Sequence, residues 1–176
     1  MRQIDRDTYW LVLLIIGGLS GLISSFIGPN LLHFLMFQSG DTILVQTPFL
    51  TNILTFIATG IFVMACIGMI LERKIWTYAG TLLLVVSIAI GCYANLGYYT
   101  LVSYNDITIK NHMLEEKYNW EEIEEAKVID NTNESIKKIQ LTFKNGKEEL
   151  LEINRVHASE IRTIRNMFLH YNIKLN

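Results

Sequence analysis

The first hundred residues of the chain consist of three long apolar runs that contain no charged side chain. These runs cover residues 9–38, 42–71 and 75–97. A helix of about 20 apolar residues crosses the hydrocarbon core of a bilayer. The pattern therefore predicts three transmembrane helices, over about residues 9–27, 52–71 and 75–97.

The polar positions between these runs predict how the helices are joined. Gly28-Pro29-Asn30 should end the first helix, because proline lacks an amide donor and disfavours helical geometry in the residue before it. Residues 31–37 are then too few to cross again, and we expect them to lie in the interface or to close the mouth of the bundle. We expect residues 38–41 to form a solvent-exposed turn. The charged residues 72–74 form a short connection, so helices two and three should be a tight hairpin.

In the second half the apolar period changes to the alternation of strands. Ile107 and Ile109 alternate with polar residues, and residues 139–143 and 148–153 flank a turn that contains Asn145-Gly146. A two-residue loop would place Ile139 opposite a glutamate, so we predict a three-residue loop with Gly146 in the left-handed conformation. The expected pairs are Lys144 with Glu148, Leu141 with Leu151, and Ile139 with Ile153.

The end of the chain reads as an amphipathic helix that caps the sheet. Asn154 is the expected N-cap. The apolar residues recur at helical spacing on one side. They are Val156, Ile161, Ile164, Phe168 and Leu169. The carboxylates of residues 121–125 form either one further helical turn or a solvated loop.

Charge divides the chain into a membrane half and a water-soluble half. Residues 1–97 hold four of the 15 Lys and Arg residues and four of the 17 Asp and Glu residues. The remaining 79 residues therefore carry eleven basic and thirteen acidic side chains, and no basic face is available to bind nucleic acid. Cys66 and Cys92 both fall inside apolar runs, where a thiol is usually a small packing group.

The basic residues that flank the runs predict an orientation. Arg2 and Arg6 precede the first run, Arg73 and Lys74 follow the second, and only Lys110 lies within about a dozen residues of the third. We expect the chain to span the plasma membrane. The positive-inside rule then places its amino terminus in the cytoplasm. Three crossings then place the C-terminal domain outside.

Few residues of the membrane half are candidates for a specific role. Gly17 and Gly21 form a Gly-x-x-x-Gly pair, which lets a second helix approach closely, either within the bundle or between subunits of a homo-oligomer. His33 could be a proton or metal group, although a single structural histidine at the headgroup level is the more common case. No charge lies inside the three runs, which disfavours an ion path.

The soluble half contains no recognisable catalytic, cofactor or metal motif. His33, His112, His157 and His170 lack a second ligand at metal-binding spacing. Lys144 and Lys147 form a basic hairpin tip that could contact anionic headgroups. Tyr118 and Trp120 could anchor a partner, but alternate residues of one strand more often pack in a core. We therefore expect a protein that is not an enzyme and needs no cofactor.

The segment Lys117-Tyr118-Asn119-Trp120-Glu121-Glu122-Ile123 resembles bacterial pleckstrin-homology-like (PH-like) domains, in which an aromatic strand leads into an acidic turn and a buried aliphatic residue. The resemblance covers about residues 107–175. It implies an α+β domain, a bent antiparallel sheet or barrel closed by the final helix, in residues 100–176 behind a transmembrane domain in residues 1–99. Residues 98–104 are a candidate additional strand.

The resemblance implies a docking module for a protein, a peptide or a lipid. Proteins of this kind are similar to regulatory or bacteriocin self-protection (immunity) factors, and their domain is usually cytoplasmic. The charge rule places the domain outside the cell, whereas the resemblance implies a cytoplasmic domain. A fourth membrane pass or a re-entrant segment within residues 31–50 would make the two agree. The alternatives are an accessory subunit of an export complex, with Gly17 and Gly21 on its packing face, and an intramembrane enzyme that uses His33.

Overall fold

The computed structural model describes residues 6–71, 73–129, 136–154 and 158–175. The chain forms two compact units. The helical unit is made of Met1–Met36 and Thr47–Tyr98, and the sheet unit is made of Phe37–Gln46 and Tyr99–Asn176. Each unit is described in turn.

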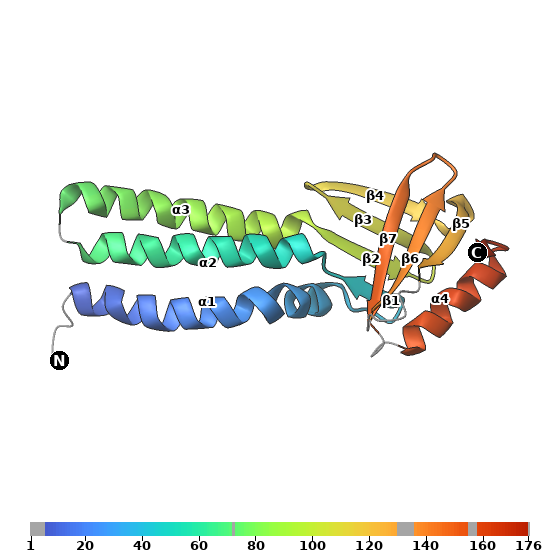
Figure 1. Ribbon diagram of the computed structural model, residues 1–176, viewed down its shortest axis with the longest axis horizontal. Helices are drawn as coiled ribbons and strands as arrows, with labels where there is room; N and C mark the ends of the chain where they lie inside the picture. Colours follow the sequence, from blue (N-terminus) through green and yellow to red (C-terminus); the bar gives the residue numbers. More distant parts are fainter. Residues whose placement is uncertain (1–5, 72, 130–135, 155–157, 176) are drawn as a thin grey trace. The chain divides into compact units, whose positions relative to one another are not determined.

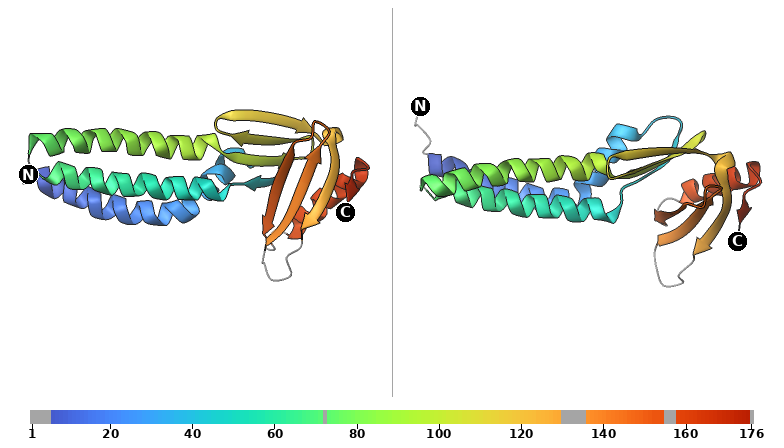
Figure 2. Two further views of the ribbon diagram at one scale, coloured as in Figure 1. Left: turned by 45° about the horizontal axis from the view of Figure 1, so that its top comes forward. Right: turned by 90° about the horizontal axis from the view of Figure 1, so that it is seen from above.

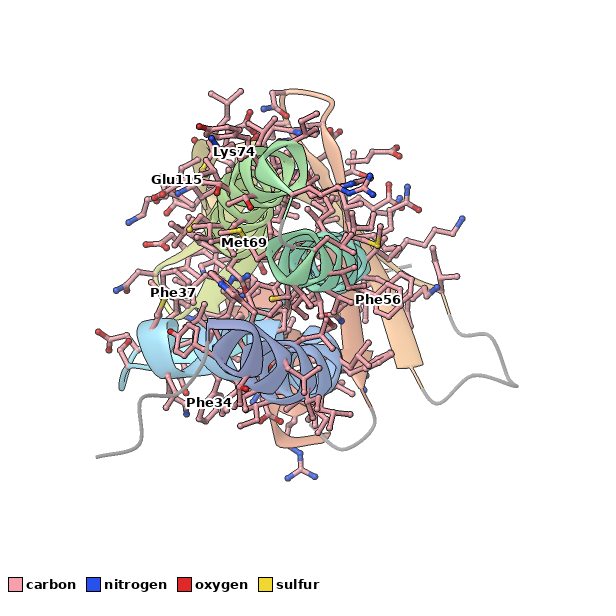
Figure 3. The ribbon with its side chains drawn as sticks, turned by 90° about the vertical axis from the view of Figure 1, so that its left-hand side faces the viewer. Phe34, Phe37, Phe56, Met69, Lys74 and Glu115 are labelled. Atoms are coloured by element: carbon pink, nitrogen blue, oxygen red, sulfur yellow. The ribbon has the colours of Figure 1, made fainter. Side chains whose placement is uncertain are left out.

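The helical unit contains three helices, each long and apolar enough to cross a membrane. They are α1 (Arg6–Phe37), α2 (Phe49–Ile70) and α3 (Lys74–Gly97). They lie side by side in Figures 1 and 2. Phe34 and Phe56, both about half exposed, lie on the outer faces of α1 and α2 (Figure 3), as expected for side chains that meet lipid. The three predicted long apolar helices are thus confirmed, and their length and composition fit membrane spans.

The prediction that Gly28-Pro29-Asn30 ends the first helix is wrong. The α1 helix continues through Pro29 to Phe37, and its last turns change direction after the proline (Figures 2 and 3). Pro29 removes one amide donor, and the Asn30 side chain donates to the Phe26 carbonyl one turn earlier, at 3.3 Å. Membrane helices tolerate proline better than helices in water. The proline therefore bends the helix instead of ending it.

Small residues bring α2 and α3 together as the predicted hairpin. A Cβ atom on Gly80 would lie 2.9 Å from the carbonyl oxygen of Ala65, and the Ser87 hydroxyl donates to the carbonyl of Ala58 at 2.8 Å. Buried small residues recur on both helices at intervals of seven or three, which keeps them on one seam. They are Ala58, Ala65 and Gly68 on α2 and Gly80, Ser87 and Ala94 on α3.

The segment between α1 and α2 contains a strand that the sequence analysis missed. β1 (Thr42–Gln46) pairs antiparallel with β2 (Tyr99–Ser103), the strand that follows α3. Leu44 of β1 is buried in the core of the sheet unit. Residues 42–46 are therefore part of the sheet and not the start of the second membrane run, and a re-entrant segment through them does not form.

The sheet unit contains two four-stranded sheets. Their strand orders are β1-β2-β3-β4 and β7-β6-β5-β8, and only the β5–β8 pair is parallel. The strands of the two sheets run in different directions in Figure 1. The remaining bounds are β3 (Asp106–Asn111), β4 (Leu114–Asn119), β5 (Ile123–Ile129), β6 (Ile136–Phe143), β7 (Glu148–Asn154) and β8 (Lys174–Leu175).

One hydrophobic core joins both sheets to the final helix, α4 (Ala158–His170). Ile164 and Phe168 of α4 are buried in it, as predicted, with the inward residues of the strands. Leu169 is 68% exposed, so its predicted place in the core is wrong. Asn154 is the last residue of β7 and not a helix cap. Val156 and His157 lie outside the described residues.

The β6–β7 hairpin has the predicted kind of turn but a different register. Gly146 has φ +79, the Phe143 amide donates to the Lys147 carbonyl at 2.9 Å, and the Gly146 amide donates to the Phe143 carbonyl at 2.8 Å. Ile139 is therefore opposite Leu151, and Leu141 is opposite Glu149. The loop begins one residue earlier than predicted, so the pairs shift by two positions. A shift of two keeps the same side chains on the core face.

Candidate functional site

Gly17 and Gly21 pack against α2 of the same chain. A Cβ atom on Gly17 would lie 2.6 Å from the Phe62 ring, and one on Gly21 would lie 2.6 Å from the Thr59 methyl group. The hydroxyls of Ser25 and Thr59 lie 3.3 Å apart one turn further along. The sequence left open whether the Gly-x-x-x-Gly pair packs within the bundle or between subunits. The contact with α2 is within the bundle.

His33 is a buried junction between the three helices. Its ring is fully buried, with Nε2 2.6 Å from the carbonyl oxygen of Asn95 on α3 and Nδ1 2.8 Å from the hydroxyl of Thr47, just before α2. A carbonyl oxygen only accepts, so Nε2 carries the hydrogen and Nδ1 accepts from Thr47 in the neutral ring. The segment after Pro29 thus closes one end of the bundle, which was one of its predicted roles.

An apolar groove of about 580 Å³ lies along the membrane helices beside this junction. Pro29 and Leu32 of α1, Thr55 of α2, and Cys92 and Asn95 of α3 line it. Asn95 donates its amide to the Gly91 carbonyl at 2.8 Å, so its polar group is used within the helix. A groove of this composition is suited to a hydrocarbon chain.

Tyr118 and Trp120 are core residues of the sheet unit. Trp120 is 1% exposed, its indole N–H donates to the Ser103 carbonyl at 3.1 Å, and its ring meets the ring of Phe168. The Tyr118 ring stacks on Phe143 with centroids 4.1 Å apart. Neither ring is available to a partner, in agreement with the expectation that alternate residues of a strand share the core.

The two lysines of the predicted basic tip differ in their surroundings, because Lys147 forms ion pairs within the sheet unit and Lys144 is exposed. The Nζ atom of Lys147 pairs with Glu116 of β4, lies 3.5 Å from Glu149 of β7, and lies 5.6 Å from the centroid of the Tyr118 ring. Lys144 is exposed at the turn. Lys147 therefore connects the ends of the two sheets, and its charge is balanced within the domain.

These contacts shift the acid–base equilibria of the pair. Hydrogen bonds from Lys147 and from the Tyr118 hydroxyl lower the pKa of Glu116. Burial lowers the pKa of Lys147, but its hydrogen bond to Glu116 and the nearby acidic groups together raise it above its ordinary value. Both shifts favour the charged pair over a broad range of pH.

A short acidic stretch links the two sheets. Trp120–Glu122 is a single 3₁₀ turn, capped by the Asn119 side chain while the Glu122 carboxylate accepts from the Asn119 amide. Glu124 and Glu125 follow in β5. Within the described residues no group of three His, Cys, Asp or Glu side chains is arranged to hold a metal ion.

The β3–β4 turn is an exposed feature that the sequence analysis did not identify. His112 and Met113 form a two-residue loop with φ values of 50 and 66, a conformation that Asn-Gly adopts most easily. Positive φ at non-glycine residues costs on the order of 1–3 kcal/mol each. Met113 is 45% and Leu114 is 72% exposed. The adjacent pair Met-Leu between polar residues is the only sequence signal for this apolar tip.

Comparison of the chain with protein-family models, with curated proteins and with solved structures gives no match. The function is therefore argued from the geometry of the two units.

Proposed function

We propose that this chain is a non-enzymatic, multi-pass membrane protein whose sheet unit is a PH-like docking module. The module binds a protein, a peptide or a lipid at the membrane surface in a regulatory or immunity-like role. The observation that carries the proposal is the strand order: one antiparallel sheet β1-β2-β3-β4, then β5-β6-β7, with α4 packed on their common core. The resemblance of residues 107–175 implies an antiparallel sheet or barrel closed by the final helix, and an antiparallel sheet that shares its core with α4 supports the proposal in that respect.

The origin of β1 supports a role at the membrane surface. β1 lies between two membrane helices in the chain, and its partner β2 begins two residues after α3 ends. The linker of residues 38–48 and the C-terminal domain are therefore on the same side of the membrane. The amino terminus and the turn between α2 and α3 lie on the other side.

The charge rule then favours a domain outside the cytoplasm. The side opposite the domain has Arg2, Arg6, Arg73 and Lys74, whereas the linker of residues 38–48 has no basic residue. Short loops rich in Lys and Arg stay in the cytoplasm. The ligand is accordingly an extracytoplasmic protein or peptide, or a lipid of the outer leaflet.

The β4 strand supplies a docking edge. It is the last strand of its sheet, so one side of its backbone has no ladder partner among the described residues. Glu115 and Lys117 are exposed on this strand. An extended peptide binds such an edge by adding a strand, with main-chain hydrogen bonds that supply affinity.

Site-specific photo-crosslinking in living cells tests this function. A benzoyl-phenylalanine probe replaces Lys117 of β4, and a matched probe replaces Lys127, an exposed residue of the central strand β5. We expect a defined protein or peptide adduct from position 117 and none from position 127. The captured species should then bind the purified full chain in nanodiscs. The absence of any specific adduct from the sheet unit would overturn the proposal.

A further inference from the structure

The tip of the β3–β4 hairpin extends past the end of the sheet at which β2 begins. Tyr99, the first residue of β2, is opposite Lys110 of β3. The antiparallel β3 strand continues past this pair to Asn111, which is opposite Leu114. The tip, defined as residues 111–114, thus extends past the first residue of β2 by the length of the turn.

Covalent distance keeps this tip close to the membrane end of α3. Only Tyr98 separates Gly97, the last residue of α3, from Tyr99. At about 3.5 Å per residue along the chain and about 5 Å across the ladder, Met113 lies within roughly 25 Å of Gly97. This upper bound is comparable to the thickness of the headgroup region plus one leaflet.

The composition of the tip fits a lipid interface. Met113 and Leu114 are large, apolar and exposed; Lys110 and His112 precede them, and Glu115 follows them, opposite Lys110 in the ladder. The Lys110 ammonium lies 5.5 Å from the centroid of the Tyr99 ring, which places a cation and an aromatic ring at the base of the tip. Apolar residues beside cationic and aromatic ones are typical of segments that rest in the headgroup region.

The backbone conformation offers an independent observation. His112 and Met113 both hold positive φ in a turn for which Asn-Gly is the unstrained sequence. Strained residues of this kind concentrate at binding sites, where the surroundings offset their cost. Here the strain presents a methionine side chain at the outermost point of the hairpin.

From these observations we infer that residues 111–114 form a membrane wedge that inserts Met113 and Leu114 among the lipid headgroups. Insertion removes exposed apolar surface from water, which is the driving force for interfacial binding. The wedge gives the sheet unit a second attachment to the bilayer besides its covalent connections to the helices.

A fluorescent probe on the tip tests the wedge in the full chain. In a Cys66→Ala, Cys92→Ala background, the variant Met113→Cys carries an environment-sensitive NBD label, and the protein is placed in phosphatidylcholine nanodiscs. We expect blue-shifted emission that doxyl-labelled lipid quenches and aqueous iodide does not. The matched variant Lys144→Cys, at the exposed β6–β7 turn, should show the reverse pattern.

Two further measurements keep the test decisive. Leu114→Cys should give the same result as Met113→Cys if the tip is inserted. In the variant His112→Asn, Met113→Gly, which keeps a two-residue turn and removes the methionine, a label at Leu114→Cys should lose part of its protection from iodide. Water-like emission from both tip positions, equal to that at Lys144→Cys, would overturn the inference.

Discussion

At the residue scale, the bundle depends on positions where no side chain fits. Gly80 is the most constrained of them, because a Cβ atom there would meet the backbone oxygen of Ala65, which no rotamer change can move. We expect Gly80→Ala to lower the free energy of unfolding by about 1–3 kcal/mol through overpacking. Gly60→Ala is the matched control, since nothing lies within 4 Å of its Cβ position. Thermal unfolding of both variants in nanodiscs makes the comparison, and equal stabilities would contradict the packing argument.

His33 illustrates a buried polar side chain with a structural role. Removal of its ring leaves the Asn95 carbonyl and the Thr47 hydroxyl without the partners they have at 2.6 and 2.8 Å. We expect His33→Ala to destabilise the helical unit by about 1–3 kcal/mol. His170→Ala, at an exposed residue of α4, should change the stability by less. If His33→Ala instead abolished a cellular activity with unchanged unfolding, the ring would have a chemical role.

The Glu116–Lys147 pair makes the sheet unit sensitive to acid. The folded pKa of Glu116 lies below its ordinary value of 4.5, so its contribution to stability is present above that value and is lost as the pH falls through the folded pKa. Lys147 has a raised pKa, so its contribution is present below 10.5 and is lost as the pH rises through its folded value.

Glu116→Gln tests this dependence. The variant should flatten the acid side of the stability curve and leave the neutral region lower than in the parent chain. The fluorescence of Trp120, followed during denaturation in a Trp10→Phe, Trp76→Phe background, measures unfolding of the core at each pH. A Glu121→Gln variant is the control on a neighbouring turn. Identical acid limbs in the parent and Glu116→Gln would refute the assignment.

At the scale of elements, β1 joins the linker between α1 and α2 to the sheet. Leu44 is 8% exposed and belongs to the core of the sheet unit. We expect Leu44→Asp to unfold that unit, because an unpaired buried carboxylate costs several kcal/mol. Gly40→Asp, in the exposed turn just before the strand, should have little effect. Trp120 fluorescence reports the sheet and far-ultraviolet circular dichroism reports the helices, and retained Trp120 burial in Leu44→Asp would show that β1 is dispensable.

The bend at Pro29 is also an element-scale feature. The part of α1 from Thr8 to Gly28 is about 30 Å long, enough to cross the hydrocarbon core by itself. The turns after Pro29 can then place the His33 ring within hydrogen-bonding distance of Thr47 and Asn95. A straight helix of 32 residues would be longer than the bilayer is thick. The bend at Pro29 shortens the part of α1 that crosses the hydrocarbon core.

At the scale of the whole molecule, the shared sheet fixes which loops lie together. Because β1 and β2 pair, Gly40→Cys and Lys144→Cys should be labelled from the same side of the membrane, and Lys74→Cys from the other. The charge rule adds that intact cells should label Gly40→Cys and Lys144→Cys with a membrane-impermeant thiol reagent. The measurement uses a Cys66→Ala, Cys92→Ala background.

Each outcome of the labelling experiment has a distinct meaning. Labelling of Lys144→Cys only after lysis would place the domain in the cytoplasm and direct the search for a partner to inner-leaflet lipids and cytoplasmic proteins. Labelling of Gly40→Cys and Lys144→Cys from opposite sides would contradict the pairing of β1 with β2.

The sequence by itself determined the features that depend on one segment at a time. Run length and the absence of charge predicted the three membrane helices, because burial of a helix in hydrocarbon requires apolar side chains all round. Alternation predicted β3 and the core positions of Tyr118 and Trp120, and helical spacing predicted the burial of Ile164 and Phe168 in α4. The conformational demand of the Lys144–Gly146 turn predicted the left-handed Gly146.

Only the tertiary structure decided features that depend on distant partners. Residues 42–46 are a short apolar run that could have continued a helix, and their pairing with β2 makes them a strand. Pro29 lies within α1 and bends it, and the turns after it are held by the contacts of His33 with Thr47 and Asn95. The partners of His33 are Asn95 of α3 and Thr47 just before α2, and those of Gly17 and Gly21 come from α2. A local pattern states which side chains must be buried, but the packed fold selects what each of them meets.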